Sequence, residues 1–161
     1  MSEAQTIAPC LWFDGLAEEA ADFYVSVFPD SRVVSKMTNP FDWPGGKAGD
    51  FVLVEFEAAG QRMQALNGGP GQAFSEAVSL SVTCEDQAEV DRVWEALTAD
   101  GGEGVFCGWL KDKYEMRWQI VPREFTEMAM SEDRAAADRV KHAMMGMVKL
   151  DVAKLRKAFE G

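Results

Sequence analysis

The sequence is poor in the residues that most often carry metal or nucleophilic chemistry. Its 161 residues include one histidine and three cysteines. Cys10, Cys84 and Cys107 are odd in number and far apart, which fits neither a disulfide framework nor a CxxC metal site. This pattern is typical of reduced thiols, so we expect a cytoplasmic protein.

Long apolar runs and basic stretches are also missing. No run approaches the roughly 18 residues of a membrane span. The first six residues lack a basic segment followed by an apolar one, so no signal peptide is expected. The net charge of −11 disfavours nucleic acids and membranes as partners, because so acidic a surface repels phosphate. The composition, 47% apolar and 27% charged, is ordinary for a globular protein that buries a core.

Residues 107–122 form the most informative segment. Two short apolar runs on either side of the charged turn Lys111-Asp112-Lys113 predict a β-hairpin. Its second half, residues 117–121, repeats the order Arg, apolar, Gln, apolar, apolar found at residues 62–66. The elements before these two segments repeat as well, which indicates a duplicated unit.

Alternation and helical spacing place the elements of each half. Strands are predicted at residues 7–13, 31–38, 51–58, 61–67, 78–84, 104–110 and 114–121. A helix is predicted at residues 16–28, with Asp14 as its cap. A second helix is predicted from Asp86 to residue 100, and the spacing of Asp86 and Glu89 predicts a capping box. Residues 39–50 predict a loop, in which Trp43 either covers a pocket or packs against its own domain. Further helices are expected at residues 123–132, 133–145 and 152–160, the last with Asp151 as its cap.

The sequence thus predicts an α+β fold of two tandem βαβββ modules, whose curved mixed sheet surrounds a cleft, and a C-terminal helical extension. The modules span residues 1–70 and 71–122 and the extension spans residues 123–161, all within one compact domain. The extension carries more apolar surface than two small modules should leave uncovered, which predicts a homodimer. The residues concerned are Met128, Met130, Met144, Met145, Met147, Val148, Leu150 and Leu155.

Several motifs resemble the PhnB-like branch of the vicinal-oxygen-chelate superfamily, whose relatives include glyoxalase I, extradiol dioxygenases and the bleomycin- and fosfomycin-resistance proteins. They are Pro9-Cys10-Leu11-Trp12-Phe13-Asp14-Gly15, Ala17-Glu18-Glu19-Ala20, Phe23-Tyr24, Phe28-Pro29, Leu66-Asn67-Gly68-Gly69-Pro70, Cys84-Glu85-Asp86-Gln87, Cys107-Gly108-Trp109-Leu110-Lys111-Asp112 and Trp118-Gln119-Ile120-Val121-Pro122. The resemblance implies paired βαβββ modules, a homodimer and the label 3-demethylubiquinone-9 3-methyltransferase. Two positions depart from the branch. It commonly has Gly where Glu115 or Met116 stands, and His-Phe where residues 71–74 read Gly-Gln-Ala-Phe.

The resemblance also bears on metal chemistry. Metal enzymes of the superfamily use two His and two Glu, and these positions correspond to Gln64, Gln119 and residues near Ile7 and Ser79. Amide oxygens are weak ligands, and the single histidine, His142, is expected in a C-terminal helix. We therefore expect no metal and no cofactor. The Gly-rich residues 67–71 follow a strand without opening a helix, which favours a linker over a phosphate-binding loop.

Aromatic and amide groups remain as the candidate lining of the cleft. The candidates are Trp12, Gln64, Asn67, Cys107, Trp109, Trp118 and Gln119. Alternatively, the tryptophans close the core and the glutamines bond to neighbours. Strand alternation places Gln119 opposite the helix side, and two neutral amides suit a neutral polar ligand.

Three hypotheses for the function stay open. The first is a metal-free protein that binds an unidentified small molecule. The second is an enzyme, either a methyltransferase or a metal-dependent lyase or dioxygenase. The third is a structural dimer whose cleft is filled by its own side chains.

Overall fold

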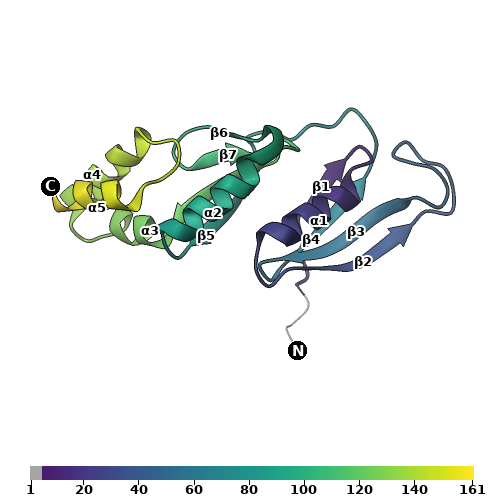
Figure 1. Ribbon diagram of the computed structural model, residues 1–161, viewed down its shortest axis with the longest axis horizontal. Coiled ribbons are helices and arrows are strands. Elements are labelled where there is room, and N and C mark those ends of the chain that lie inside the picture. Colours follow the sequence, from purple (N-terminus) through teal and green to yellow (C-terminus); the bar gives the residue numbers. More distant parts are fainter. Residues whose placement is uncertain (1–4) are drawn as a thin grey trace. The chain divides into compact units, whose positions relative to one another are not determined.

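The computed structural model describes residues 5–161, and the chain divides into two compact units, Met1–Ala73 and Phe74–Gly161 (Figure 1). Each unit begins with a strand, a helix and three further strands, which confirms the predicted duplication. The signal-peptide argument starts on residues 1–4, which lie outside the described residues. Over residues 5–161, no helix is both long and apolar enough to cross a membrane.

The first unit is a four-stranded mixed sheet with one helix on one face (Figure 1). Its elements are β1 (Cys10–Phe13), α1 (Ala17–Val27), β2 (Arg32–Thr38), β3 (Phe51–Ala58) and β4 (Gln61–Asn67). The sheet order is β1-β4-β3-β2, with β1 parallel to β4 and the other pairs antiparallel. The fully buried Tyr24 of α1 stacks on Phe56 of β3, with 6.1 Å between the ring centroids. This contact shows which side of the sheet forms the core.

A two-residue turn sets the register of the β3–β4 hairpin. Ala59 and Gly60 have φ angles of 50° and 75°, the two positive values of a type I′ turn. Such a turn places Ala58 opposite Gln61 and, counting back, Glu55 opposite Gln64. The register of these two side chains therefore follows from the length of the turn.

The second unit repeats the arrangement and adds the extension. Its sheet elements are β5 (Leu80–Cys84), α2 (Gln87–Thr98), β6 (Glu103–Gly104), β7 (Trp109–Lys111) and β8 (Arg117–Pro122), with a 3₁₀ turn at Ala99–Gly101. The order β5-β8-β7-β6 matches that of the first sheet. The prediction of one continuous strand at residues 104–110 is wrong, because a loop separates β6 from β7. The amides of Cys107 and Gly108 there leave the ladder and donate to Met147 O at 2.7 Å and Val148 O at 2.8 Å.

A buried carboxylate organises the β7–β8 turn. Asp112 is 1% exposed, and its Oδ1 accepts from the amides of Tyr114 at 2.8 Å and Met116 at 3.1 Å. Its Oδ2 accepts from Trp118 Nε1 at 2.8 Å. Glu115 has φ of 67°, a left-handed conformation that favours glycine. The turn keeps that backbone conformation although the glycine common in the resembling branch is absent.

Helix caps were predicted with mixed success. Asp86 and Asp151 accept from the amides of Glu89 and Lys154, which confirms them as caps of α2 and α5. The cap expected at Asp14 is wrong, because α1 is preceded by Leu16, which makes no side-chain cap.

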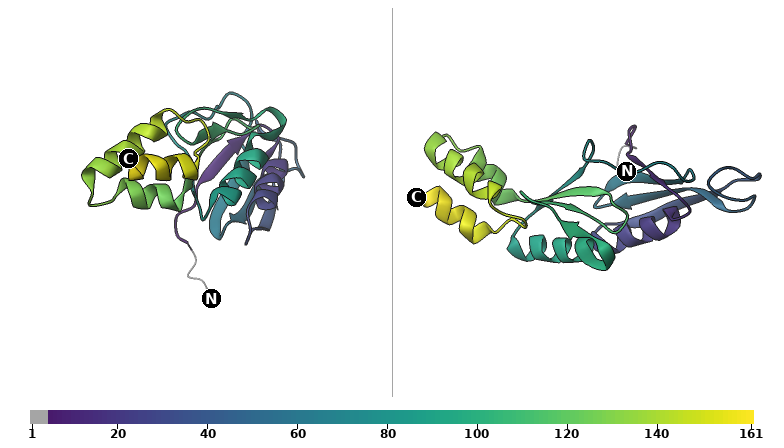
Figure 2. Two further views of the ribbon diagram at one scale, coloured as in Figure 1. Left: turned by 60° about the vertical axis from the view of Figure 1, so that its left-hand side comes forward. Right: turned by 90° about the horizontal axis from the view of Figure 1, so that it is seen from above.

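The extension consists of α3 (Arg123–Ala129), α4 (Arg134–Met145) and α5 (Val152–Glu160), which pack on one another beyond β8 (Figure 2). Its buried cluster is Met128, Val140, Leu150 and Leu155, packed against Phe125, Met144, Met147 and Phe159. Most of the apolar residues that suggested a dimer therefore form an internal core. Met130, Met145 and Val148 are more than half exposed.

Candidate functional site

Each sheet has one face covered by its helix and one face that we call the open face. On β4, Met63, Ala65 and Asn67 are buried, whereas Arg62, Gln64 and Leu66 are half-exposed. On β8, Trp118, Ile120 and Pro122 are buried, whereas Arg117, Gln119 and Val121 are half-exposed. Gln64 and Gln119 thus hold equivalent places on the open faces of their own sheets. That the two sheets enclose one cleft stays a prediction.

Glu55 is the centre of the polar contacts on the first open face. Its carboxylate accepts from Arg62 Nη2 at 2.5 Å, Gln64 Nε2 at 3.1 Å and Ser35 Oγ at 3.1 Å. The hydrogen bond from Arg62, followed by those from Gln64 and Ser35, holds the pKa of Glu55 below its usual value. Strand alternation puts Glu55 and Glu57 on one face of β3, which by itself predicts a solvated face and gives no sign of the link to Gln64. The two-residue turn could have revealed the link.

The second open face has a different environment around its glutamine. Gln119 lies beside Trp109 of β7 and Ser81 of β5, and its Nε2 contacts Ser79 Oγ at 2.9 Å. The cation beside it on β8, Arg117, is paired with Glu76 at 2.7 Å. Trp109 stands where the first sheet has Glu55, so the two faces offer different groups at matching positions.

Two of the expected site residues lie on the helix-covered side instead. Trp118 is 3% exposed and bonded to Asp112, as described above. Asn67 is 8% exposed, and its Oδ1 accepts from Ala17 N at 2.9 Å while its Nδ2 donates to Phe51 O at 3.0 Å. Asn67 thus satisfies an amide at the start of α1, the role expected of Asp14. Neither side chain is available to a ligand on an open face.

The Gly-rich segment after β4 is held between two tryptophans. Trp12 Nε1 donates to Gly69 O at 2.8 Å, and Trp43 Nε1 donates to Asn67 O at 2.7 Å. A Cβ at Gly68 would lie 2.2 Å from the ring of Trp12, so only glycine fits there. Trp43 therefore packs against its own unit. Trp12 remains 37% exposed on the open face, but its ring nitrogen is already bonded.

Two of the three cysteines, Cys10 and Cys84, are less readily ionised than a free thiol. Desolvation raises the pKa of the Cys10 thiol, and for the fully buried Cys84 desolvation raises the pKa to about 12. Cys107 lies in the loop between β6 and β7, with its Sγ 3.8 Å from Met145 Sδ of the extension. That places the Cys107 side chain toward the extension.

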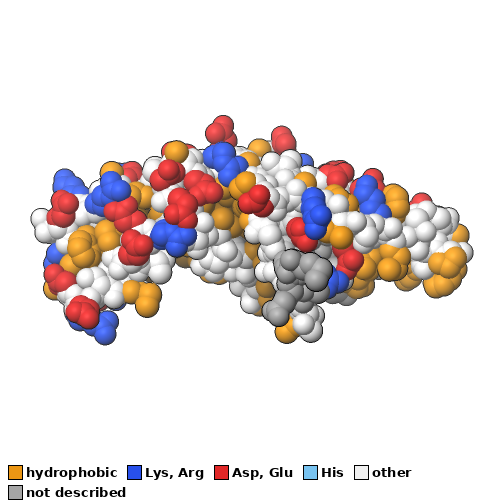
Figure 3. Space-filling view, turned by 90° about the horizontal axis from the view of Figure 1, so that it is seen from below, with side chains coloured by type: hydrophobic (Ala, Val, Ile, Leu, Met, Phe, Trp, Pro, Cys, Tyr) orange, Lys and Arg blue, Asp and Glu red, His pale blue; other side chains and the backbone are white. Residues whose placement is uncertain are grey.

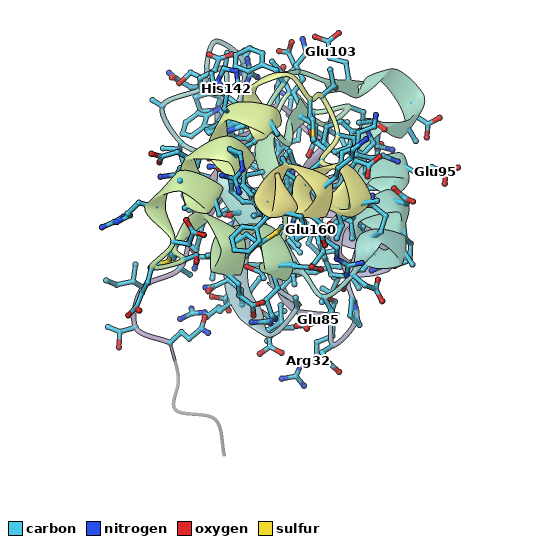
Figure 4. The ribbon with its side chains drawn as sticks, turned by 90° about the vertical axis from the view of Figure 1, so that its left-hand side faces the viewer. Arg32, Glu85, Glu95, Glu103, His142 and Glu160 are labelled. Carbon is cyan, nitrogen blue, oxygen red and sulfur yellow. The ribbon has the colours of Figure 1, made fainter. Side chains whose placement is uncertain are left out.

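The donor set offers little to a metal ion. The register equates Cys10 with Ser81, so the position that matches Ser79 is Ala8. The resemblance to the superfamily then implies an alanine, a serine and two glutamines at its four metal-ligand positions. Throughout residues 5–161, no group of three or more His, Cys, Asp or Glu side chains could hold a metal. His142 lies on α4 of the extension (Figure 4).

A groove of about 890 Å³ separates the start of α2 from α3 and α5. The cations that line it are already paired: Lys149 with Asp91 at 2.5 Å, Arg156 with Glu124, and Lys154 with Asp151 at 3.9 Å. Gln87 spans the groove, donating to Leu150 O and accepting from Val152 N. These contacts fasten the extension to α2. Figure 3 shows acidic and basic side chains interspersed on one face of the molecule.

A family model described as 3-demethylubiquinone-9 3-methyltransferase matches residues 5–121. The PhnB protein from Bacillus cereus is 35% identical, with a TM-score of 0.66, over 73% of this chain and 99% of that chain. The match to the family model ends before the extension begins. A comparison with curated proteins found no match.

More distant solved structures share the fold. Protein PA1353 from Pseudomonas aeruginosa is 19% identical, with a TM-score of 0.59, over 74% of this chain and 98% of that chain. The fosfomycin resistance protein FosX from Listeria monocytogenes, complexed with Mn(II) and sulfate, is 14% identical, with a TM-score of 0.51. The match covers 74% of this chain and 90% of FosX. At these identities the likeness concerns the fold alone.

Proposed function

Because the chain belongs to the 3-demethylubiquinone-9 3-methyltransferase family of PhnB-like proteins, with the vicinal-oxygen-chelate fold, we propose that it is a metal-free small-molecule-binding protein. One observation carries the proposal. The superfamily's ligand positions hold Gln64, Gln119, Ser79 and Ala8, yet the open faces still present half-exposed amides beside tryptophans. Apolar walls with a few placed polar groups are typical of small-molecule sites.

Two measurements test this proposal. Elemental analysis of protein purified without chelator should find no stoichiometric metal, and stoichiometric zinc, nickel, iron or manganese would refute it. A compound library should then be screened against protein labelled with ¹⁵N at tryptophan. A ligand of the open faces should shift the indole signals of Trp12 or Trp109 and leave that of the buried Trp118 in place.

The alternative function is an enzyme, and the name of the family model is what favours it. Calorimetric titration with S-adenosylmethionine distinguishes the two. We expect no micromolar binding, because the Gly-rich segment after β4 is held by Trp12 and Trp43 and opens no helix. Micromolar binding with a one-to-one stoichiometry would favour the methyltransferase.

Location and assembly belong to the same proposal. The three cysteines are free thiols, which supports the cytoplasm. The homodimer is supported by the apolar side chains that the core of the extension leaves exposed, namely Met130, Met145 and Val148. Light scattering at micromolar concentration should give the mass of two chains, and the mass of one chain would refute the dimer.

A further inference from the structure

Glu55 determines which way the amide of Gln64 faces. The two side chains meet at 3.1 Å, and Glu55 also accepts from Arg62 and Ser35. An ionised carboxylate only accepts hydrogen bonds. The part of Gln64 that faces Glu55 must therefore be the NH₂ group, so its carbonyl oxygen Oε1 faces away.

The carbonyl oxygen of Gln64 is consequently an open acceptor. No side chain or backbone group within residues 5–161 donates to it. Gln119 lacks this constraint, because the hydroxyl of Ser79 that it contacts can donate or accept. Of the two glutamines, Gln64 is therefore the one whose carbonyl oxygen is held in a fixed orientation.

An apolar strip lies next to this acceptor. Leu66 is the next residue of β4 on the same face, and it is paired with Leu53 on β3 and with Trp12 on β1. All three side chains are partly exposed. Gln64 Oε1 thus stands at the edge of a surface that can receive an aliphatic or aromatic group.

We propose that the open face of the first sheet binds organic ammonium compounds, with the N–H group donating to Gln64 Oε1 and the apolar body lying on Trp12, Leu53 and Leu66. This inference rests on the proposed ligand-binding function and specifies its ligand. An ionised carboxylate or phosphate has only hydrogen-bond acceptors, so its oxygen would face the carbonyl oxygen of Gln64 with no hydrogen between them. The net charge of −11 also favours a cation over an anion. Glu55 is a positioning residue, because it acts through Gln64.

The test compares a matched pair of probes, 2-phenylethylammonium and 3-phenylpropionate, by calorimetry and by the indole signal of Trp12. We expect the ammonium to bind roughly tenfold more tightly, the factor of one charge-assisted hydrogen bond. Gln64→Leu should reduce this preference to the part that the net charge supplies, whereas Gln72→Leu, on an exposed loop, should keep it in full. Glu55→Gln should also reduce the preference although Gln64 is intact, because glutamine at position 55 lets the amide of Gln64 turn over.

The outcomes separate this inference from the proposed function. Equal or tighter binding of the carboxylate, or an unchanged preference in Gln64→Leu, would overturn the ammonium assignment and leave ligand binding standing. Absence of binding by both probes would also overturn it. If in addition no library compound shifts Trp12 or Trp109, the proposed function fails as well. Far-UV circular dichroism of each variant checks the fold; Glu55 keeps Arg62 and Ser35 as partners in Gln64→Leu.

Discussion

The hydrogen bond between Asp112 and Trp118 holds a buried indole against the turn between β7 and β8. The indole donates to Oδ2 at 2.8 Å, while Oδ1 accepts the two backbone amides of the turn. In Asp112→Asn, the favourable orientation keeps Oδ1 for those amides and turns an NH₂ group toward the indole N–H. A buried donor then faces a buried donor. We expect the variant to lose about 2–3 kcal/mol of unfolding free energy, the range for a lost hydrogen bond to a charged group.

A double-mutant cycle tests this reasoning. Trp118→Phe removes the opposing donor, so Asp112→Asn should cost about 1 kcal/mol or less in that background. The expected coupling between the two changes is about 1–2 kcal/mol. Urea denaturation followed by far-UV circular dichroism measures all four proteins without relying on tryptophan fluorescence. An equal cost of Asp112→Asn in both backgrounds would show that Asp112 does not hold Trp118.

Three further predictions concern single positions. Glu115→Gly should stabilise the protein by about 1 kcal/mol in urea denaturation, because Glu115 has φ of 67°; destabilisation would refute the turn geometry. Asn67→Ala should lower the unfolding free energy by about 1–2 kcal/mol, because it removes the partner of Ala17 N. Asn39→Ala is the control, because the Asn39 side chain is half-exposed and makes no hydrogen bond within residues 5–161; an equal effect of the two substitutions would refute the capping role. Cys84 should resist a thiol reagent at pH 8 until the protein unfolds, because its pKa is raised to about 12. The exposed Cys10 should react in the native state, and rapid reaction of all three thiols would contradict the burial of Cys84.

The elements with clean periodicity could be predicted from the sequence. β3 and β4 were placed at their observed bounds, since their residues alternate and a tight turn separates them. The same alternation correctly put Gln119 opposite the buried Trp118. The strand expected at residues 104–110 failed because its central amides bond to the extension, a contact distant in sequence. Periodicity contains no information about such partners.

The candidate site was harder to predict, because a residue type does not reveal its hydrogen-bond partner. Asn67 and Trp118 belong to motifs shared with the resembling branch, yet they cap α1 and bond to Asp112. Gln64 lies on the open face, but the sequence predicts an amide that donates and accepts equally. Its single free acceptor depends on Glu55, which the sequence pattern assigned to solvent.

The duplicated sheets also explain why the two glutamines should not be treated as equivalent. Both lie on the open face at matching positions, but one contacts a carboxylate and the other a hydroxyl. Only the carboxylate forces an orientation, so the two matching positions differ in their chemistry. A ligand that needs a fixed acceptor can therefore distinguish the first sheet from the second. The ratio of its affinities for Gln64→Leu and Gln119→Leu would measure that difference, and equal affinities would show that Glu55 imposes no orientation.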